Sequence, residues 1–186
     1  MFFIEMIEPE VAEGQLKEVY EEVLKKRGTI ADVYKVQSLN PASIIHHMEL
    51  YLGIMFGKSP LRRYQREMIA VIVSANNQCE YCQTYHGIAL NNFWKDEPKV
   101  QQLRTDYTKV ALSEVDQLLC ELAKNLTLNP GHVNEAALEP LKKAGLEDRA
   151  ILDATLVIAY FNFANRLVMG LGVSLDNQKD EWVHYD

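Results

Sequence analysis

Apolar residues recur every three or four positions along most of the chain, and strand-like alternation never lasts beyond a few residues. A period near 3.6 is typical of amphipathic helices, whereas half-buried strands repeat every second residue. The pattern therefore predicts an all-α protein. The clearest helical stretches are residues 13–28, 40–56, 61–76, 79–94, 113–125, 129–145 and 147–172.

Start and stop signals support several of these boundaries. Gly28 and Gly145 each follow an apolar periodic stretch, as glycine does where a helix ends in a left-handed residue. Pro41 fits the first turn of a helix, and Ser113 with Asp116 forms a box-like N-terminal cap. The stretch "REMIAVIVSANN" is apolar on most sides, so we expect that helix to be buried.

Two of the helical stretches resemble each other at an offset of 86 residues. Glu67 then aligns with Asp153 and Asn76 with Asn162, while Asn165 takes the place of Cys79. We interpret this as a degenerate internal repeat whose second copy, about residues 147–172, keeps an acid and lacks the thiols. Chance similarity between two apolar helices is the alternative.

Length and charge narrow the class of protein. The chain has 186 residues, enough for one domain, and we predict a single domain over 1–186 with a polar tail at 174–186. With 19 basic and 26 acidic residues the net charge is −7, which argues against nucleic-acid or anionic-membrane partners. Apolar runs such as "MIAVIVSA" are shorter than the roughly 20 residues of a membrane span. No export signal is visible, so we expect a soluble, cytoplasmic protein.

The segment "NNQCEYCQTYHG" concentrates reactive side chains, holding two of the three cysteines and one of the five histidines. On a helix, Cys82 and His86 lie about 60° and 20° from Cys79, so all three share a face. A nearby imidazolium lowers a thiol pKa, and Asn77 as N-cap would place Cys79 in the first turn, where free N–H groups favour a thiolate. A reducing compartment makes such a CxxC pair redox-active or metal-binding rather than a structural staple.

Glu67 is a carboxylate within an apolar helix, twelve positions before Cys79. On one unbroken helix it would lie about 18 Å from the motif. If the chain turns at Asn76 and Asn77, the two helices pack side by side and the acid reaches the thiol and His86. A buried carboxylate needs such a partner.

These residues carry a family resemblance. Glu67, then Cys79-Glu80-Tyr81-Cys82, then His86 resembles the active-site signature (67–86) of AhpD-like alkylhydroperoxidases, in the carboxymuconolactone decarboxylase superfamily. "SLNPASI" and "AYFNFANRLVMGLGV" look like its peroxidase-related branch, so the resemblance covers roughly residues 35–173.

The resemblance implies an all-α AhpD-like fold assembled as a homo-oligomer, a trimer or hexamer, that reduces peroxides without a metal or other cofactor. Cys82 would be the peroxidatic thiolate and Cys79 the resolving thiol. Glu67 and His86 would relay protons, and an external dithiol, lipoyl or thioredoxin-like, would restore the thiols.

Two features complicate this scheme. Well-studied members of the family have a histidine immediately before the second cysteine, where this chain has Tyr81. Helix-terminus physics also favours Cys79 as the more acidic thiol, whereas the family assigns the first attack to Cys82. We follow the family because Cys82 stands four residues before His86.

Other interpretations remain open. The protein could be a protein-disulfide oxidoreductase or a redox-sensing oligomer, and Glu67, Cys79, Cys82 and His86 could supply four zinc ligands.

Among the other candidate residues, Cys120 is expected to be a buried small residue, and at most one of the adjacent His46 and His47 can face a pocket. We expect the polar residues of 147–172 to form a buried hydrogen-bond network rather than a catalytic site. These residues are Asp153, Asn162, Asn165 and Arg166.

Overall fold

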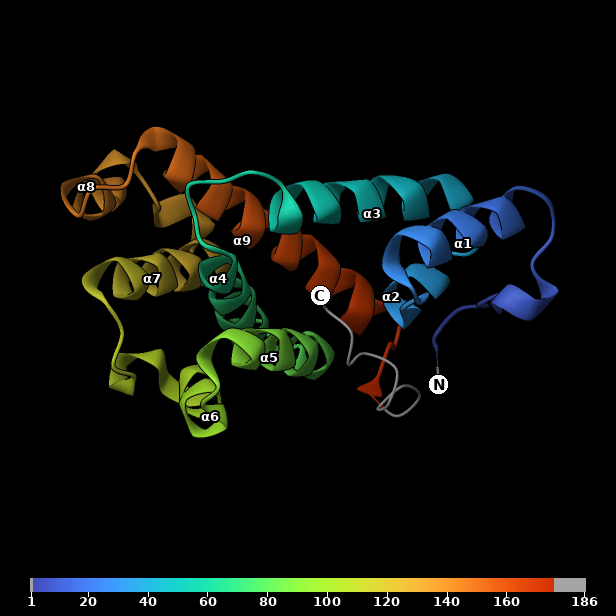
Figure 1. The fold of residues 1–186 in the computed structure, drawn as a ribbon, viewed down its shortest axis with the longest axis horizontal. Helices are drawn as coiled ribbons and strands as arrows, with labels where there is room; N and C mark the ends of the chain where they lie inside the picture. Colours follow the sequence, from blue (N-terminus) through green and yellow to red (C-terminus); the bar gives the residue numbers. More distant parts are fainter. Residues whose placement is uncertain (1, 176–186) are drawn as a thin grey trace. The chain divides into compact units, whose positions relative to one another are not determined.

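The structure, a computed structural model, describes residues 2–175, and over that range it has helices and no β-strand (Figure 1). The all-α prediction is confirmed. The α-helices are α1 (Gly14–Arg27), α2 (Asp32–Lys35), α3 (Pro41–Phe56), α4 (Arg63–Asn76), α5 (Glu80–Trp94), α6 (Glu97–Asp106), α7 (Glu114–Leu128), α8 (Glu135–Lys143) and α9 (Asp148–Gly170). Three single-turn 3₁₀ helices accompany them at Pro9–Val11, Tyr107–Lys109 and Pro130–His132.

Most of the predicted boundaries are confirmed within two or three residues. Gly28 follows α1 with φ 75°, a left-handed conformation that costs glycine little, and its N–H bonds the Leu24 carbonyl. Pro41 is the first residue of α3, and the Ser113 side chain caps α7 by accepting from the Asp116 N–H at 3.2 Å. The periodicity did not indicate α6, because only Val100 and Leu103 of its residues are buried.

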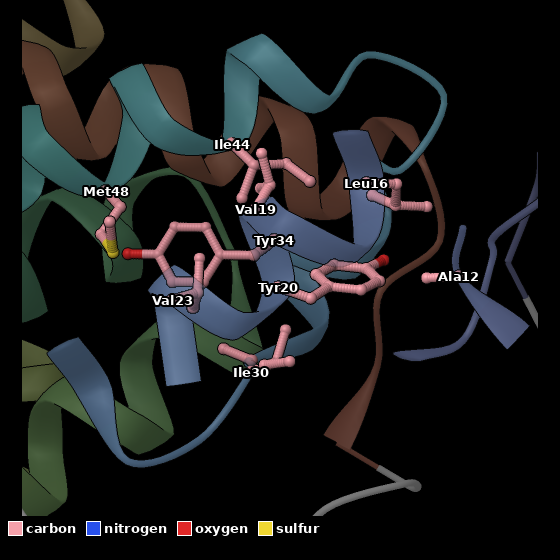
Figure 2. Close-up of a cluster of buried hydrophobic side chains, with 10 residues drawn as sticks. Ala12, Leu16, Val19, Tyr20, Val23, Ile30, Tyr34, Ile44 and Met48 are labelled. Carbon is pink, nitrogen blue, oxygen red and sulfur yellow. The ribbon is translucent and has the colours of Figure 1, made fainter. Parts of the chain in front are cut away.

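The chain divides into two compact units, residues 1–53 with 166–186, and residues 54–165. In the first unit, α1 packs its apolar stripe against α2 and the first half of α3 (Figure 2). The predicted stripe residues Leu16, Val19, Tyr20 and Val23 are all buried there. The Tyr20 hydroxyl donates to the Ile7 carbonyl at 2.8 Å, which ties the N-terminal segment to this core.

The second unit is organised around α4. Every residue from Gln65 to Ser74 is buried, as the sequence predicted for this helix. Its polar members have partners: Gln65 donates to Asp116 of α7 at 2.8 Å, and Arg66 donates to the Ile54 and Gly57 carbonyls at 3.1 and 3.0 Å. These bonds fix α4 against its neighbours and so fix the position of Glu67 in the middle of it.

Helix α9 is, within the described residues, the one helix long and apolar enough to span a membrane by length and composition. The sequence prediction rested on shorter runs such as that of α4 and did not include α9. Its most apolar window has a mean hydropathy of 1.3, and 56 % of that window is buried inside the protein. Burial of this extent is typical of a core helix. The predicted polar tail lies outside the described residues from 176 onward.

Candidate functional site

The site is built on the hairpin of α4 and α5, which lie side by side (Figure 1). The chain turns through Asn77, Gln78 and Cys79, where Gln78 takes a left-handed φ of 60° and the Cys79 N–H bonds the Ser74 carbonyl at 2.9 Å. The predicted turn is therefore present. The prediction that Asn77 is the N-cap of the second helix is wrong: Asn77 ends α4 and Cys79 itself precedes the first residue of α5. The reason is that the left-handed Gln78 delays the start of α5 by two residues.

Glu67 and His86 meet across the hairpin. The Glu67 side chain is fully buried, and its Oε2 lies 2.6 Å from Nδ1 of His86. A carboxylate can only accept, so Nδ1 carries the proton and Nε2 is the acceptor nitrogen of the neutral ring. The edge of the imidazole packs against Phe161 with ring centroids 4.5 Å apart. Carboxylate and aromatic ring together fix the tautomer and the orientation of His86.

The other oxygen of Glu67 bonds Arg63, a partner that the sequence analysis missed. Arg63 lies one turn before Glu67 on α4, and its guanidinium stands over the Phe56 ring, 4.1 Å from the centroid. The sequence does contain a basic residue four positions before the acid, which is the spacing of an ion pair on one helix face. The sequence predicted that the acid is buried, but it did not single out Arg63 as the partner of the buried carboxylate.

These partners decide the charge of Glu67. Burial alone would raise its pKa, but the hydrogen bonds and electrostatic attraction of His86 and Arg63 outweigh burial and lower the pKa below its usual value. Glu67 is therefore a carboxylate at neutral pH. A carboxylate with a lowered pKa is a weak base, so its chemical effect passes through His86.

Cys79 and Cys82 are both free thiols and both buried, with 1 % and 5 % of their surfaces exposed. A hydrogen bond from the Cys82 thiol lowers the pKa of Cys79, against the opposing effect of burial. Donating that bond raises the pKa of Cys82, and burial raises it further. In the reduced protein Cys79 is thus the more acidic thiol, as the helix-terminus argument expected.

A network of side-chain amides joins the cysteine turn to α9, which confirms the predicted network for Asn162 and Asn165. Asp153 bonds Ser59 and Arg149 instead, and Arg166 is exposed, so the prediction is wrong for Arg166. The Asn77 amide donates to Asn162 at 3.1 Å and to Asn165 at 3.0 Å. Asn165 in turn donates to the Ser74 hydroxyl at 3.2 Å, and its side chain acts to lower the pKa of Cys82. Asn77 therefore anchors the turn instead of capping α5.

The two copies of the interpreted repeat share two side-chain bonds. Arg149 donates to Asp153 at 2.8 Å on α9, as Arg63 donates to Glu67 on α4. The amides of Asn76 and Asn162 each donate to the carbonyl four residues earlier, at 2.8 and 3.0 Å. Asp153, however, also accepts from Ser59 at 2.6 Å, so no histidine takes the place that His86 has beside Glu67.

The remaining candidates have structural positions. Cys120 is fully buried, which confirms the prediction. Of the adjacent histidines, His47 is buried against Tyr34, and its Nδ1 accepts a hydrogen bond from the Gln37 amide at 2.8 Å, while His46 is exposed. Tyr81, in place of the family's histidine, is buried with its ring 4.6 Å from that of Tyr85.

Among residues 2–175, no group of three or more His, Cys, Asp and Glu side chains is arranged to hold a metal ion. Two of the four hypothetical zinc ligands, Glu67 and His86, bond each other. That the working protein needs no zinc stays a prediction, which elemental analysis of the purified protein tests.

Comparison with known proteins finds relatives that resemble this helical fold and contain the segment of the cysteine motif. The family model "Carboxymuconolactone decarboxylase family" matches residues 46–106, which contain the whole Glu67 to His86 constellation. The chain is thus similar to this family over that segment, and it resembles AhpD-like structures in its fold. No curated protein matches it.

Solved structures resemble it over nearly the whole chain. A peroxidase-related protein from a Silicibacter species is 28 % identical, with a TM-score of 0.80 over 91 % of this chain and 88 % of that one. An alkylhydroperoxidase AhpD core protein, also peroxidase-related, from Ralstonia eutropha is 25 % identical, with a TM-score of 0.82 over 93 % and 91 %. A debrominase in complex with 2,3,4-tribromopyrrole shares the fold at 17 % identity, with a TM-score of 0.77 over 94 % and 92 %.

Proposed function

We propose that this protein is a thiol-dependent peroxidase that cycles between a Cys79 and Cys82 dithiol and their disulfide. The observation that supports it most is the 2.6 Å contact between Glu67 and His86, because it orients an imidazole base on the helix face that carries the cysteines. The peroxidase-related relatives at 25–28 % identity support the same class of reaction.

The reaction has two steps in the protein. The Cys82 thiolate attacks one peroxide oxygen, the O–O bond breaks, and the sulfur becomes a sulfenic acid while the leaving alkoxide takes a proton from His86. The Cys79 thiol then attacks the sulfenic sulfur, forming the disulfide and releasing water. An external dithiol, lipoyl or thioredoxin-like, reduces the disulfide and is itself oxidised to a disulfide.

Glu67 supports both proton movements from behind His86. Its negative charge stabilises the imidazolium that forms when Nε2 accepts the thiol proton. Arg63 keeps Glu67 ionised and so preserves this effect. Positioning of this kind requires no metal and no cofactor, and we propose that the protein uses none.

The choice of Cys82 as the attacking thiol follows the family scheme and its place four residues before His86. The hydrogen bond within the pair favours Cys79 as the more acidic thiol in the resting protein. A sulfur can attack without being the more acidic of a pair, provided that its proton can leave to a base, and His86 is that base.

The burial of Cys79 and Cys82 argues against the alternative function of a protein-disulfide oxidoreductase. A substrate that is itself a folded protein must bring a sulfur into contact with a reactive cysteine, and at most 5 % of either cysteine is exposed. A peroxide is smaller. We propose a small-molecule substrate, and a soluble, cytoplasmic homo-oligomer in which the reductant reaches the site by a narrow arm such as lipoyl.

The test is intact-mass analysis with thiol trapping, before and after one equivalent of peroxide is added to the reduced protein. The expected product is two protons lighter, with the loss confined to the peptide that contains Cys79 and Cys82, and Cys120 still alkylated after denaturation. Steady peroxide consumption with dihydrolipoamide or reduced thioredoxin should follow. A protein that keeps all three thiols after peroxide treatment would rule out the cycle.

A further inference from the structure

A pocket lies in the second unit, where α4 packs against α6 and α7 (Figure 1). Its volume is about 170 Å³, and the buried side chains of Ile72 on α4 and Leu103 on α6 form part of its lining. Other lining residues come from the end of α6, from the 3₁₀ helix Tyr107–Lys109 and from Lys124 of α7. None of the described residues that line it reacts or relays protons in the cysteine site.

Two cations line this pocket, and within the described chain neither has a carboxylate partner. Arg104 donates to the side-chain oxygens of Gln83 at 3.4 Å and Gln101 at 3.3 Å, both neutral amides at longer than the usual hydrogen-bond distance. The Nζ of Lys124 lies 5.9 Å from the centre of the Tyr107 ring. Because a guanidinium has five N–H donors, Arg104 retains donors for a ligand.

Among the described residues that line the pocket, Asp106 is the one acid, and it is paired within its own turn. Its carboxylate bonds Lys109 at 3.1 Å and accepts from the Thr108 hydroxyl at 2.6 Å. With Arg104 and Lys124 against this one paired acid, the pocket is positive, although the whole chain has a net charge of −7. A concave surface lined by one sign of charge concentrates ions of the opposite sign.

The size and charge of the pocket define the class of ligand. A cavity of about 150 Å³ holds a molecule such as benzene, so a small organic anion fits here. Two cations attract a doubly charged group more strongly than a singly charged one, and arginine binds carboxylate and phosphate oxygens through paired N–H donors.

We propose that this pocket binds a small dianion whose charge is on oxygen, a phosphate monoester or a dicarboxylate, and that Arg104 and Lys124 hold it. Such binding is independent of the reaction proposed for Cys79 and Cys82, so the failure of either proposal leaves the other standing.

The test is a titration of the ¹⁵N-labelled protein at about pH 7.5 and constant ionic strength, followed by NMR of the backbone amides. Methyl phosphate and malonate represent the two kinds of dianion, and acetate is the singly charged control. We expect saturable shifts at residues 103–108 and 124, with a Kd of about 1 mM or below for at least one dianion, because two charge-assisted hydrogen bonds correspond to about that affinity. Acetate should bind at least about tenfold more weakly. The dianion that binds more tightly identifies the ligand as phosphate or dicarboxylate.

Variants of the lining residues locate the binding. Arg104→Gln and Lys124→Gln each remove one cation and should each weaken dianion binding at least about fivefold. The matched control is Lys143→Gln, at an exposed lysine of α8 that does not line the pocket, and it should bind as the parent does. Asp106→Asn removes the competing negative charge while its side-chain oxygen can still accept from the Thr108 N–H, so it should bind the dianion at least about twofold more tightly.

The same NMR spectra show whether each variant is folded. If Arg104→Gln does not fold, Lys124→Gln and Asp106→Asn decide, because Lys124 is exposed and asparagine keeps the shape of Asp106. Shifts that do not saturate, equal binding of acetate and the dianions, or parent affinity in folded Arg104→Gln and Lys124→Gln proteins would each overturn the inference.

Discussion

At Glu67, both carboxylate oxygens are engaged, one by Arg63 and one by His86, although the side chain has no contact with solvent. An isolated carboxylate so placed would take up a proton. Here the two partners keep it ionised, so the residue works by holding a positive imidazole rather than by taking a proton itself. That distinction can be measured.

Replacing Glu67 by glutamine should slow the reaction of the reduced protein with peroxide by at least about tenfold at neutral pH, because His86 loses the negative charge that stabilises its protonated form and so becomes a weaker general base. The rate should recover partly as rising pH ionises the thiol without help. Stopped-flow oxidation across pH measures this. Glu121→Gln, the same change at an exposed carboxylate of α7, should keep the parent rate.

The fold should survive Glu67→Gln, because the amide oxygen can still accept from Arg63 or His86. Circular dichroism and light scattering of the same samples check this. A folded Glu67→Gln protein that reacts at the parent rate at every pH would make the carboxylate structural.

The two cysteines should differ when replaced singly. Cys82→Ser should abolish oxidation by peroxide, and Cys79→Ser should still react once and stop at a sulfenic acid on Cys82, because no resolving thiol is present. Dimedone labelling followed by peptide mass analysis detects that acid. The opposite pattern, with a sulfenic acid on Cys79 in the Cys82→Ser protein, would assign the first attack to the more acidic thiol.

Among the elements, the α4 and α5 hairpin shows how far the sequence could predict the site. The spacing of Glu67, Cys79 and His86 indicated two packed helices and a turn at Asn77, and the contact of Glu67 with His86 agrees with that. The bond of Arg63 to Glu67 and the bond of Asn165 to Asn77 were not predicted as such. Each depends on tertiary packing, which periodicity within one helix does not encode.

Helix α3 carries a pH-dependent element in one buried histidine, His47. Burial lowers the pKa of His47 from 6.5 to about 4. The unfolded chain therefore binds a proton at His47 at a higher pH than the folded protein does. The free energy of unfolding accordingly falls as the pH drops from 6.5 toward about 4, and this contribution is fully present only above 6.5.

When the pH is lowered from 7 to about 4.5, protonation of His47 in the unfolded chain should reduce the free energy of unfolding by roughly 2 kcal/mol. Urea unfolding of the parent and of His47→Gln at both pH values measures it, and the variant should lose that much less on acidification. His46→Gln, one residue away and exposed, should behave as the parent does. Equal pH dependence of all three proteins would contradict the prediction.

For the whole molecule, α9 presents an apolar stripe that the described chain leaves exposed. Leu152, Leu156 and Phe163 fall within about 40° of one another on the helix and are 53 %, 40 % and 44 % exposed. A row of this kind is typical of a surface that a second protein covers. It is the feature that supports the predicted homo-oligomer.

Light scattering at micromolar concentration should give a mass of several chains, with a trimer or hexamer expected from the family resemblance. Leu156→Glu with Phe163→Glu should shift the protein toward smaller species, because each buries a charge in the contact. Leu128→Glu, at an exposed apolar residue of α7, is the control. A parent protein that remains monomeric would refute the assembly.

The left-handed Gln78 has a consequence for which sequences can encode this turn. A residue with a side chain occupies φ 60° at some cost, β-branched residues most of all, whereas glycine and asparagine adopt it readily. In a saturation library selected for folded, peroxide-reactive protein, position 78 should be enriched in Gly and Asn and depleted of Val, Ile and Thr. Selection at position 78 would act on the backbone conformation of the turn, because this turn sets where Cys79 and α5 begin.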